Sequence, residues 1–262
     1  MIRALYSATT GMNAQQMNID NISNNLANVN TTGFKKSRIQ FQDLLYQTIK
    51  EAGTRTGEST QKPVELTVGV GVRPIATQKS FRQGSLTETG NPLDIGINGD
   101  GFFKVLNSEG ERFYTRDGSF KVNSEGEIVN NDGYFLDPTI TVPTDTESVN
   151  ISPDGIVLAK ISGVVEPEEI GQIDLSRFVN SAGLKSIGGN LYEETPASGQ
   201  PMIGTPNTLN FGHVAQGYLE TSNVQLVEEM VNMITAQKAF EINSKVVKTS
   251  EAMLQTAQNL KR

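Results

Sequence analysis

The apolar residues at the start of the chain recur with a heptad spacing. Residues 1–32 contain no proline and a single glycine, Gly11. On a helix, this spacing forms a narrow apolar seam that packs against another helix. The sequence therefore predicts an N-terminal helix over residues 1–32. Its seam positions are Leu5, Met12, Ile19, Ile22, Leu26 and Val29.

The other end of the chain has the same pattern. Residues 218–262 contain neither glycine nor proline, which predicts a long C-terminal helix. Its apolar positions are Leu226, Met230, Met233, Phe240, Val247 and Leu254. A second apolar row includes Ala239, Val246 and Met253, so the stripe is broader than one partner helix requires. Ser222 and Asn223 are candidate N-caps, followed by Glu228 and Glu229 near the positive end of the helix dipole.

Between these ends the pattern changes to short alternating runs. From Gly99 onward, GFFKV, RFYTRD, SFKVN, EIVNN and YFLDP are separated by the turn sequences NSEG, DG and NDG. Such runs predict a meander of hairpins, and the whole region 73–217 is expected to be a β sandwich or open barrel. Further predicted strands cover residues 68–72, 93–97, 149–151, 156–161 and 170–175.

A connecting segment, residues 33–72, joins the first helix to the β region. Residues 53–63, GTRTGESTQKP, are small and polar, and a loop of this length is either functional or disordered. Composition alone favours a flexible excursion.

Composition narrows the classes of function. The 22 Lys and Arg against 29 Asp and Glu give a net charge of −7, which argues against nucleic acid as a partner because phosphate binding needs clustered cations. The longest continuous apolar runs have the length of a strand, so no membrane insertion is expected. The N-terminus lacks the features of a cleaved secretory signal. With no Cys and one His, His213, no disulfide and no zinc site or cofactor is expected.

The predicted fold class is therefore α+β, with two terminal helices that enclose an all-β domain. Pairing the two ends is the simplest way to cover both seams. The first helix has seven Asn among 32 residues and only Arg3 and Asp20 as charges; uncharged amides suit a surface that contacts protein on several sides. Both features favour self-assembly, since a contact that does not close into a ring generates a filament. An ordinary monomer with an intramolecular helical pair is the alternative.

Several sequence motifs along the chain give a more specific interpretation. SNNLANVNTTGFKKSR at 23–38 resembles the N-terminal signature of the flagellar axial proteins, which build the rod and hook of the bacterial flagellum. FQDLLYQT at 41–48 is similar to the version found in distal rod members. TSNVQLVEEMVNMITAQKAFEINSKVV at 221–247 resembles the C-terminal signature, and GDGFFKV and YTRDGSF also match rod and hook members. The motif positions include Asn24, Asn25, Leu26, Asn28, Gly33, Phe34, Asn232, Glu241 and Asn243.

This resemblance implies a structural, non-enzymatic subunit of the distal rod. The terminal helices would form an inner coiled-coil domain around a channel, and residues 46–63 would act as a brace between subunits. The implied partners are further copies of the chain, other rod proteins, the hook protein, the surrounding ring proteins and the flagellar export apparatus. Export would proceed without signal cleavage, to a rod that spans the periplasm. A proximal rod or hook-basal-body member is the runner-up.

Other chemistry has weak support in the sequence. Asp94, Asp100 and Asp117 could serve as the acid and base of a peptidoglycan-active or sugar-binding β protein, although Asp in turn-rich β structure is more often a turn former. Residues 94–98 lack calcium-loop spacing, and GVGVR and GINGDG lack the context of a phosphate loop. In the first signature, Asn24, Asn25 and Asn28 are expected to bridge backbone groups, and Gly33 to adopt positive φ where the helix stops.

Overall fold

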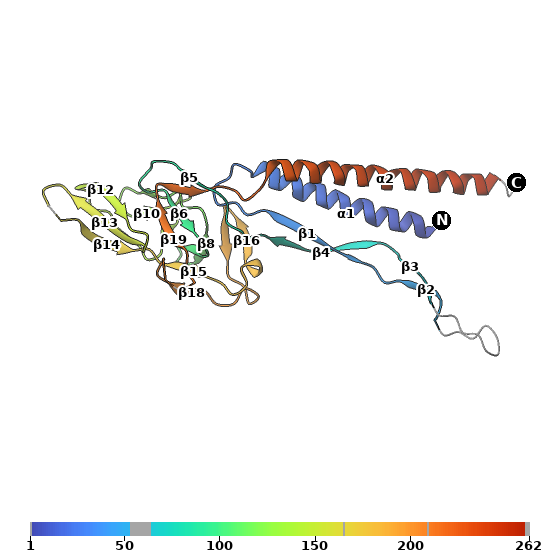
Figure 1. Cartoon of the computed structure of the whole chain (residues 1–262), viewed down its shortest axis with the longest axis horizontal. Helices are drawn as coiled ribbons and strands as arrows, with labels where there is room; N and C mark the ends of the chain where they lie inside the picture. The colour runs from blue at the N-terminus through green and yellow to red at the C-terminus, as the bar shows by residue number, and fades with distance from the viewer. Residues whose placement is uncertain (1, 53–63, 165, 209, 260–262) are drawn as a thin grey trace. The chain divides into compact units, whose positions relative to one another are not determined.

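A computed structural model describes residues 2–52, 64–164, 166–208 and 210–259 (Figure 1). The chain divides into two compact units. The helical unit comprises Met1–Leu26, Ser37–Gln78 and Gln225–Arg262, and the β unit comprises Ala27–Lys36 and Lys79–Val224. The fold class is α+β, as predicted.

The helical unit contains two long helices that run antiparallel, side by side. They are α1, Ile2–Ala27, and α2, Leu226–Asn259 (Figure 1). The pairing explains the one glycine within α1, because a Cβ at Gly11 would lie 3.0 Å from Asn243 Nδ2 of α2. A larger side chain at this position would therefore push the helices apart.

Both helices are shorter than the predicted ranges 1–32 and 218–262. Tyr218–Glu220 forms strand β20, which pairs with β5, so ladder pairing holds this segment extended. The predicted N-caps are wrong: Ser222 Oγ accepts a hydrogen bond from Val224 N at 3.3 Å, and Asn223 binds other segments. The first turn of α2 closes instead through Glu229 N to Gln225 O at 3.0 Å.

The helical unit also contains a two-stranded ribbon, most of which the sequence pattern did not predict. Strand β1, Ser37–Asp43, pairs with β4, Val72–Lys79, and β2, Gln47–Lys50, pairs antiparallel with β3, Leu66–Val68. The predicted strand at 68–72 is wrong, because β3 ends at Val68, β4 begins at Val72 and the residues between them are not in a strand. Gly71 there has φ +122°, and a Cβ would collide with Thr10 Oγ1 of α1.

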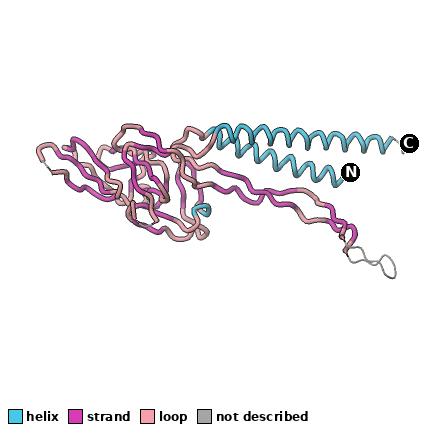
Figure 2. The backbone as a smooth tube through the Cα atoms, viewed as in Figure 1, coloured by secondary structure: helices cyan, strands magenta, loops and turns pink. Residues whose placement is uncertain are grey.

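Strands and loops make up most of the β unit (Figure 2), and its largest sheet has nine strands. Its main path is β16-β17-β8-β7-β11-β10-β9, and β15 joins β7 to β18. The predicted hairpins are confirmed for β7-β8, β9-β10 and β10-β11. The predicted continuous meander is wrong between β8 and β9, because β8 pairs with β17 and β7 pairs with β11 instead. The strand bounds are β7 Phe102–Leu106, β8 Arg112–Thr115, β9 Lys121–Val122, β10 Ile128–Val129, β11 Phe135–Leu136, β15 Leu175–Arg177, β16 Lys185–Gly188, β17 Leu191–Glu193 and β18 Met202–Gly204.

Smaller ladders complete the β unit. A three-stranded sheet has the order β12-β13-β14, and two pairs consist of β6 with β19 and β5 with β20. The predicted strand at 170–175 is two strands in different sheets, because the fully buried Ile173 between them crosses from one sheet to the other. The bounds are β5 Leu86–Glu88, β6 Ile95–Asn98, β12 Thr146–Ile151, β13 Ile156–Ile161, β14 Glu168–Gln172, β19 His213–Gln216, β20 Tyr218–Glu220 and the short 3-10 helix η1 Ser181–Gly183.

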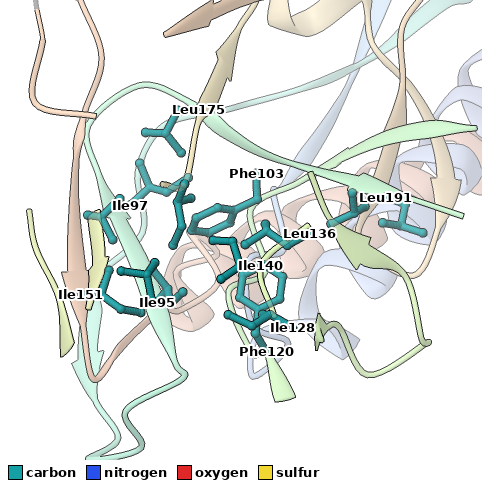
Figure 3. Close-up of a cluster of buried hydrophobic side chains, with 14 residues drawn as sticks. Ile95, Ile97, Phe103, Phe120, Ile128, Leu136, Ile140, Ile151, Leu175 and Leu191 are labelled. Atoms are coloured by element: carbon teal, nitrogen blue, oxygen red, sulfur yellow. The ribbon is translucent and has the colours of Figure 1, made fainter. Parts of the chain in front are cut away.

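The hydrophobic core lies within the β unit. Figure 3 shows side chains from several strands converging on one cluster, in which the Phe103 and Phe120 rings meet edge to face at 5.3 Å. Phe103, Ile95 and Ile97 have no exposed surface. A second, aromatic cluster contains Phe102, Tyr114, Phe178, Leu184 and Tyr192. Apolar burial of this extent makes the β unit a stable body in its own right.

Candidate functional site

The helices α1 and α2 bury mainly small or polar side chains. The buried positions are Ala8, Ala14, Ile22 and Asn25 in α1 and Glu229, Ala236 and Ser250 in α2. Ile22 is the one large apolar residue among them. The pair therefore lacks the apolar core that its heptads could supply.

The predicted interface residues lie mostly at the edge of this face. Ile22 is 4% exposed, whereas Leu226 and Met230 are 47% and 48% exposed. The remaining predicted residues are half-buried: Leu5, Met12, Ile19, Leu26, Val29, Met233, Phe240, Val247 and Leu254. The structure thus places the two seams on neighbouring helices and leaves every seam residue except Ile22 at least partly exposed.

The prediction missed part of the apolar surface of α2. Val227, Val231, Ile234 and Ile242 are each more than half exposed. Together with Val246 and Met253 of the second predicted row, they carry apolar surface well beyond the seam. A count of all β-branched and aliphatic residues in the helix, rather than of one heptad frame, would have found them.

Two asparagines of α1 anchor the start of the ribbon. Asn25 Nδ2 donates to Ser37 O at 2.9 Å, and Ser37 N donates to Asn25 Oδ1 at 3.0 Å. Asn21 Nδ2 also donates to Ser37 O, at 2.8 Å. Asn25 Nδ2 further reaches Glu229 Oε2 of α2 at 3.2 Å. The predicted backbone bridging is therefore confirmed for Asn25, while Asn21, Ser37 and Glu229 were not predicted.

The other motif residues lie apart from this anchor. Asn24 is exposed on α1, and Asn28 Oδ1 accepts a hydrogen bond from Thr31 Oγ1 at 3.1 Å. On α2, Asn232 and Glu241 are exposed. Glu241 pairs with Lys238 at 2.8 Å, and Asn243 faces Gly11 as described above. These residues form no common cluster.

Gly33 has the predicted positive φ, +68°. It does not stop the helix, because α1 ends at Ala27. Instead, a Cβ at Gly33 would lie 2.7 Å from Asp117 N, so only glycine allows the chain to approach this backbone. The neighbouring Phe34 is buried, with Lys79 Nζ 5.6 Å from its ring centre. The segment after α1 is thus packed into the β unit.

A buried ion cluster, Lys35, Arg116 and Glu220, fixes three segments of the β unit. Lys35 Nζ lies 2.5 Å from Glu220 Oε1, and Arg116 Nη1 lies 3.3 Å from Glu220 Oε2. All three side chains are at most 2% exposed. Backbone groups complete the cluster: Lys35 donates to Arg82 O at 2.9 Å, and Gly84 N donates to Glu220 Oε1 at 2.7 Å.

The electrostatics of this cluster are dominated by burial. Desolvation lowers the pKa of Lys35, and the attraction of Glu220 opposes this shift. Desolvation likewise lowers the pKa of Arg116, whose guanidinium remains charged at any ordinary pH. Two cations therefore share one carboxylate in a place closed to water. Removing that carboxylate would leave two uncompensated charges.

The aspartates considered for catalysis are engaged in turns. Asp94 accepts hydrogen bonds from Thr89 Oγ1 at 2.6 Å and Asn91 Nδ2 at 3.1 Å. Asp117 accepts from Ser119 N and Ser119 Oγ, and burial raises the pKa of its carboxyl. Asp100 is an exposed side chain paired with Arg177 at 3.6 Å. Local turn contacts account for Asp94 and Asp117, and an exposed ion pair accounts for Asp100.

His213, the one histidine of the chain, lies on strand β19. His213 Nε2 lies 3.2 Å from Asn98 Nδ2, within the β6-β19 pair. Across residues 2–52, 64–164, 166–208 and 210–259, no three His, Cys, Asp or Glu side chains gather as metal ligands would. Neither described helix is long and apolar enough to cross a membrane.

Comparison with known proteins identifies the family. Three family profiles match: "Flagella basal body rod protein" at residues 5–35, "Flagellar hook protein FlgE/F/G D1 domain" at 96–159, and "Flagellar basal body rod FlgEFG protein C-terminal" at 215–260. The chain is 52% identical to the flagellar basal-body rod protein FlgG of Borreliella burgdorferi, over all of both chains. It is 40% identical to FlgG of Bacillus subtilis, again over all of both chains. The flagellar hook-basal body complex protein FlhP of Bacillus subtilis is 30% identical over 97% of each chain. The chain belongs to the family of flagellar basal-body rod proteins, and it is a structural protein of the flagellum.

Proposed function

We propose that this chain polymerises through its terminal helices into the distal rod, a hollow helical drive shaft that transmits torque from the motor to the hook. The observation that carries this proposal is the uncovered apolar surface of the helical unit. Val227 is 73% exposed and Ile242 is 63% exposed, although both lie on a helix with a partner in the same chain. A monomer with only an intramolecular pair would leave this surface in water.

The energetics favour burial between copies. Covering one such side chain contributes about 1.5–3 kcal/mol, and α2 alone offers several. Identical copies that meet through different faces in a head-to-tail manner extend into a helical polymer rather than closing into a pair. In the assembled rod, the terminal ranges 1–32 and 218–262 supply the inner layer around the channel. Residues 73–217 supply the outer layer, and 33–72 connect the two.

The ribbon supports a second contact between subunits. Leu45 is 89% exposed and Tyr46 is 59% exposed, at the step between β1 and β2. Ile49 and Leu66, on the paired strands β2 and β3, are also exposed. Tyr46 and Ile49 lie within the proposed brace, residues 46–63, and Leu45 and Leu66 flank it; residues 53–63 lie outside the described residues. An apolar ribbon of this kind can stiffen a polymer by binding a neighbouring copy.

Partners and location follow from the family. As a basal-body rod protein, the chain belongs in the flagellar basal body with other rod and hook components. More specifically, we propose contacts with other rod proteins, the hook protein and the surrounding ring proteins. We further propose export through the flagellar apparatus without signal cleavage, and a rod that crosses the periplasm. No enzymatic activity is proposed.

Two alternatives remain distinguishable. A hook-basal-body function has weaker support, because identity to FlhP is 30% whereas identity to FlgG from the same organism is 40%. A peptidoglycan-active protein would need Asp94 or Asp117 as a reacting group. Purified Asp94→Asn and Asp117→Asn chains tested on isolated cell walls would detect that activity, and cleavage by the native chain that either variant abolishes would favour the enzyme.

The test of polymerisation is electron microscopy of the concentrated full-length chain. Ile234→Asp places a charge on exposed apolar surface of α2, and Gln237→Asp places the same charge at an exposed polar position of the same helix. We expect tubular filaments from the native chain and the Gln237→Asp control, and none from Ile234→Asp, whose dilute monomer should keep native circular dichroism. Equal assembly of both variants, or monomers at every concentration of the native chain, would contradict the proposal.

A further inference from the structure

The chain passes between the helical unit and the β unit at four points, after residues 26, 36, 78 and 224. At three of these crossings, a residue within two positions of the crossing contacts the others inside the β unit. These residues are Lys36, Ser80 and Asn223. A drive shaft needs such crossings to move together, because separate single chains between two bodies behave as soft hinges. The contacts among these residues therefore bear on stiffness.

Both the oxygen and the nitrogen of the Asn223 side-chain amide form hydrogen bonds with the other two crossing segments. Its Oδ1 accepts a hydrogen bond from Lys36 N at 2.8 Å. Its Nδ2 donates to Ser80 O at 2.8 Å and to Arg82 O at 2.9 Å. An amide has two donor hydrogens and one carbonyl oxygen, so each of these groups is engaged. Among uncharged side chains, only the amides of Asn and Gln offer this combination.

Backbone contacts reinforce the same three segments. Ser80 N donates to Lys36 O at 2.9 Å, and Asn223 N donates to Phe34 O at 3.4 Å. Three residues before Asn223, Glu220 accepts from Lys35 and from Gly84 N, as part of the buried ion cluster. Glu220 O also accepts from Gly33 N at 2.8 Å. The segment that precedes α2 is therefore bonded on both sides to the other crossing segments.

We propose that Asn223 is a positioning residue that makes the crossing segments a single mechanical element. We name Asn223, Lys36, Ser80 and Arg82 the junction clamp. The junction clamp passes load between the segments that lead into β1, out of β4 and into α2. This inference rests on the proposed function for its mechanical consequence, but its hydrogen bonds can be tested on the monomer alone.

The first experiment measures amide hydrogen exchange in the full-length monomer. In Asn223→Ala, the Lys36 amide loses its acceptor, and we expect its exchange to accelerate by about tenfold, the ratio that corresponds to one lost hydrogen bond. The Ser80 amide keeps its acceptor, Lys36 O, and should accelerate less, through loosening of the segment that Asn223 Nδ2 binds. In Asn223→Asp, which keeps the acceptor and loses both donors, Lys36 should stay protected. Asn180→Ala is the matched control, since Asn180 Nδ2 makes one hydrogen bond, to Ala197 O, elsewhere in the β unit.

The second experiment measures the persistence length of assembled filaments by electron microscopy. We expect Asn223→Ala filaments to be more flexible than native and Asn180→Ala filaments, with an unchanged thermal midpoint for the core of the β unit. Unchanged exchange at Lys36 and Ser80 would overturn the clamp. Native persistence length despite faster exchange would overturn its mechanical role. Faster exchange in a chain that never assembles would instead contradict the proposed function and leave the hydrogen-bonded clamp intact.

Discussion

The two units of this protein use apolar residues in opposite ways. The β unit places Phe103, Ile95 and Ile97 entirely out of water. The helical unit leaves Val231, Ile234 and Ile242 more than half exposed and buries Ala8, Ala14 and Ala236 instead. The β unit thus buries its large apolar side chains within itself, whereas the helical unit leaves many of its own exposed and would need a neighbouring copy to cover them. The same chain combines a self-sufficient body with an incomplete one.

The largest difference between the two units is expected when one large aromatic side chain is removed from each. We expect Phe103→Ala to lower the free energy of unfolding of the β unit by about 3–5 kcal/mol, because a fully buried ring leaves a cavity. Phe240→Ala, on the half-buried seam of α2, should cost the monomer far less and should affect assembly instead. Calorimetry of both dilute variants measures the difference. Equal losses in the two monomers would mean that the helical unit has a core of its own.

Charged groups should show the same contrast. Glu220→Gln leaves Lys35 and Arg116 buried without an anion, and we expect a loss of about 3–5 kcal/mol in unfolding free energy. The matched control is Glu241→Gln on α2, whose pair with Lys238 is 63–67% exposed and should contribute under about 1 kcal/mol. Urea unfolding of both variants provides the measurement. A small effect at Glu220 would show that water reaches the buried ion cluster.

A polar anchor should matter more to the helical unit than its apolar seam does in the monomer. Asn25→Ala removes the partner of Ser37 N, and we expect a loss of about 1–3 kcal/mol because these backbone groups would be left unpaired. Asn13→Ala, at an exposed position of the same helix, controls for the gain in helix propensity. Thermal melts followed by far-ultraviolet circular dichroism compare the two. Identical melts would place the stability of this unit elsewhere.

The smallest predicted effect concerns alkaline pH. Burial raises the pKa of Tyr192 above its ordinary value of 10.0. Above pH 10 the unfolded state therefore loses this proton first, the folded state holds more protons, and stability falls as the pH rises. Tyr192→Phe should remove up to about 1.4 kcal/mol per pH unit of that slope. Denaturant titrations of the native and variant chains at several pH values would show it, and parallel slopes would contradict it.

Sequence patterns were most informative where a local rule decides the structure. Heptads without proline located both helices, and turn sequences located the hairpins β7-β8, β9-β10 and β10-β11, because periodicity and turn residues act within a few positions. They did not show that β8 pairs with β17 rather than with β9. The positive φ of Gly33 followed from the same kind of local reasoning. The motif in residues 23–38 identified the family before any geometry was known.

The tertiary structure decided the partners of these elements. Residues 218–220 form a strand rather than a helix because they pair with β5. The strand predicted at 68–72 is interrupted at Gly71, where Thr10 of α1 leaves no space for a Cβ. Asn223 looked like a helix cap and is the centre of the junction clamp. The ion cluster joins Lys35 to Glu220 across 185 positions of the chain, a separation that no spacing rule covers. The family, the two helices and most of the hairpins between β7 and β11 could be read from the sequence, because short-range sterics and periodicity act within a few positions. Only the folded chain decided which polar groups are buried together, since desolvation and hydrogen bonding depend on what long-range packing brings into contact.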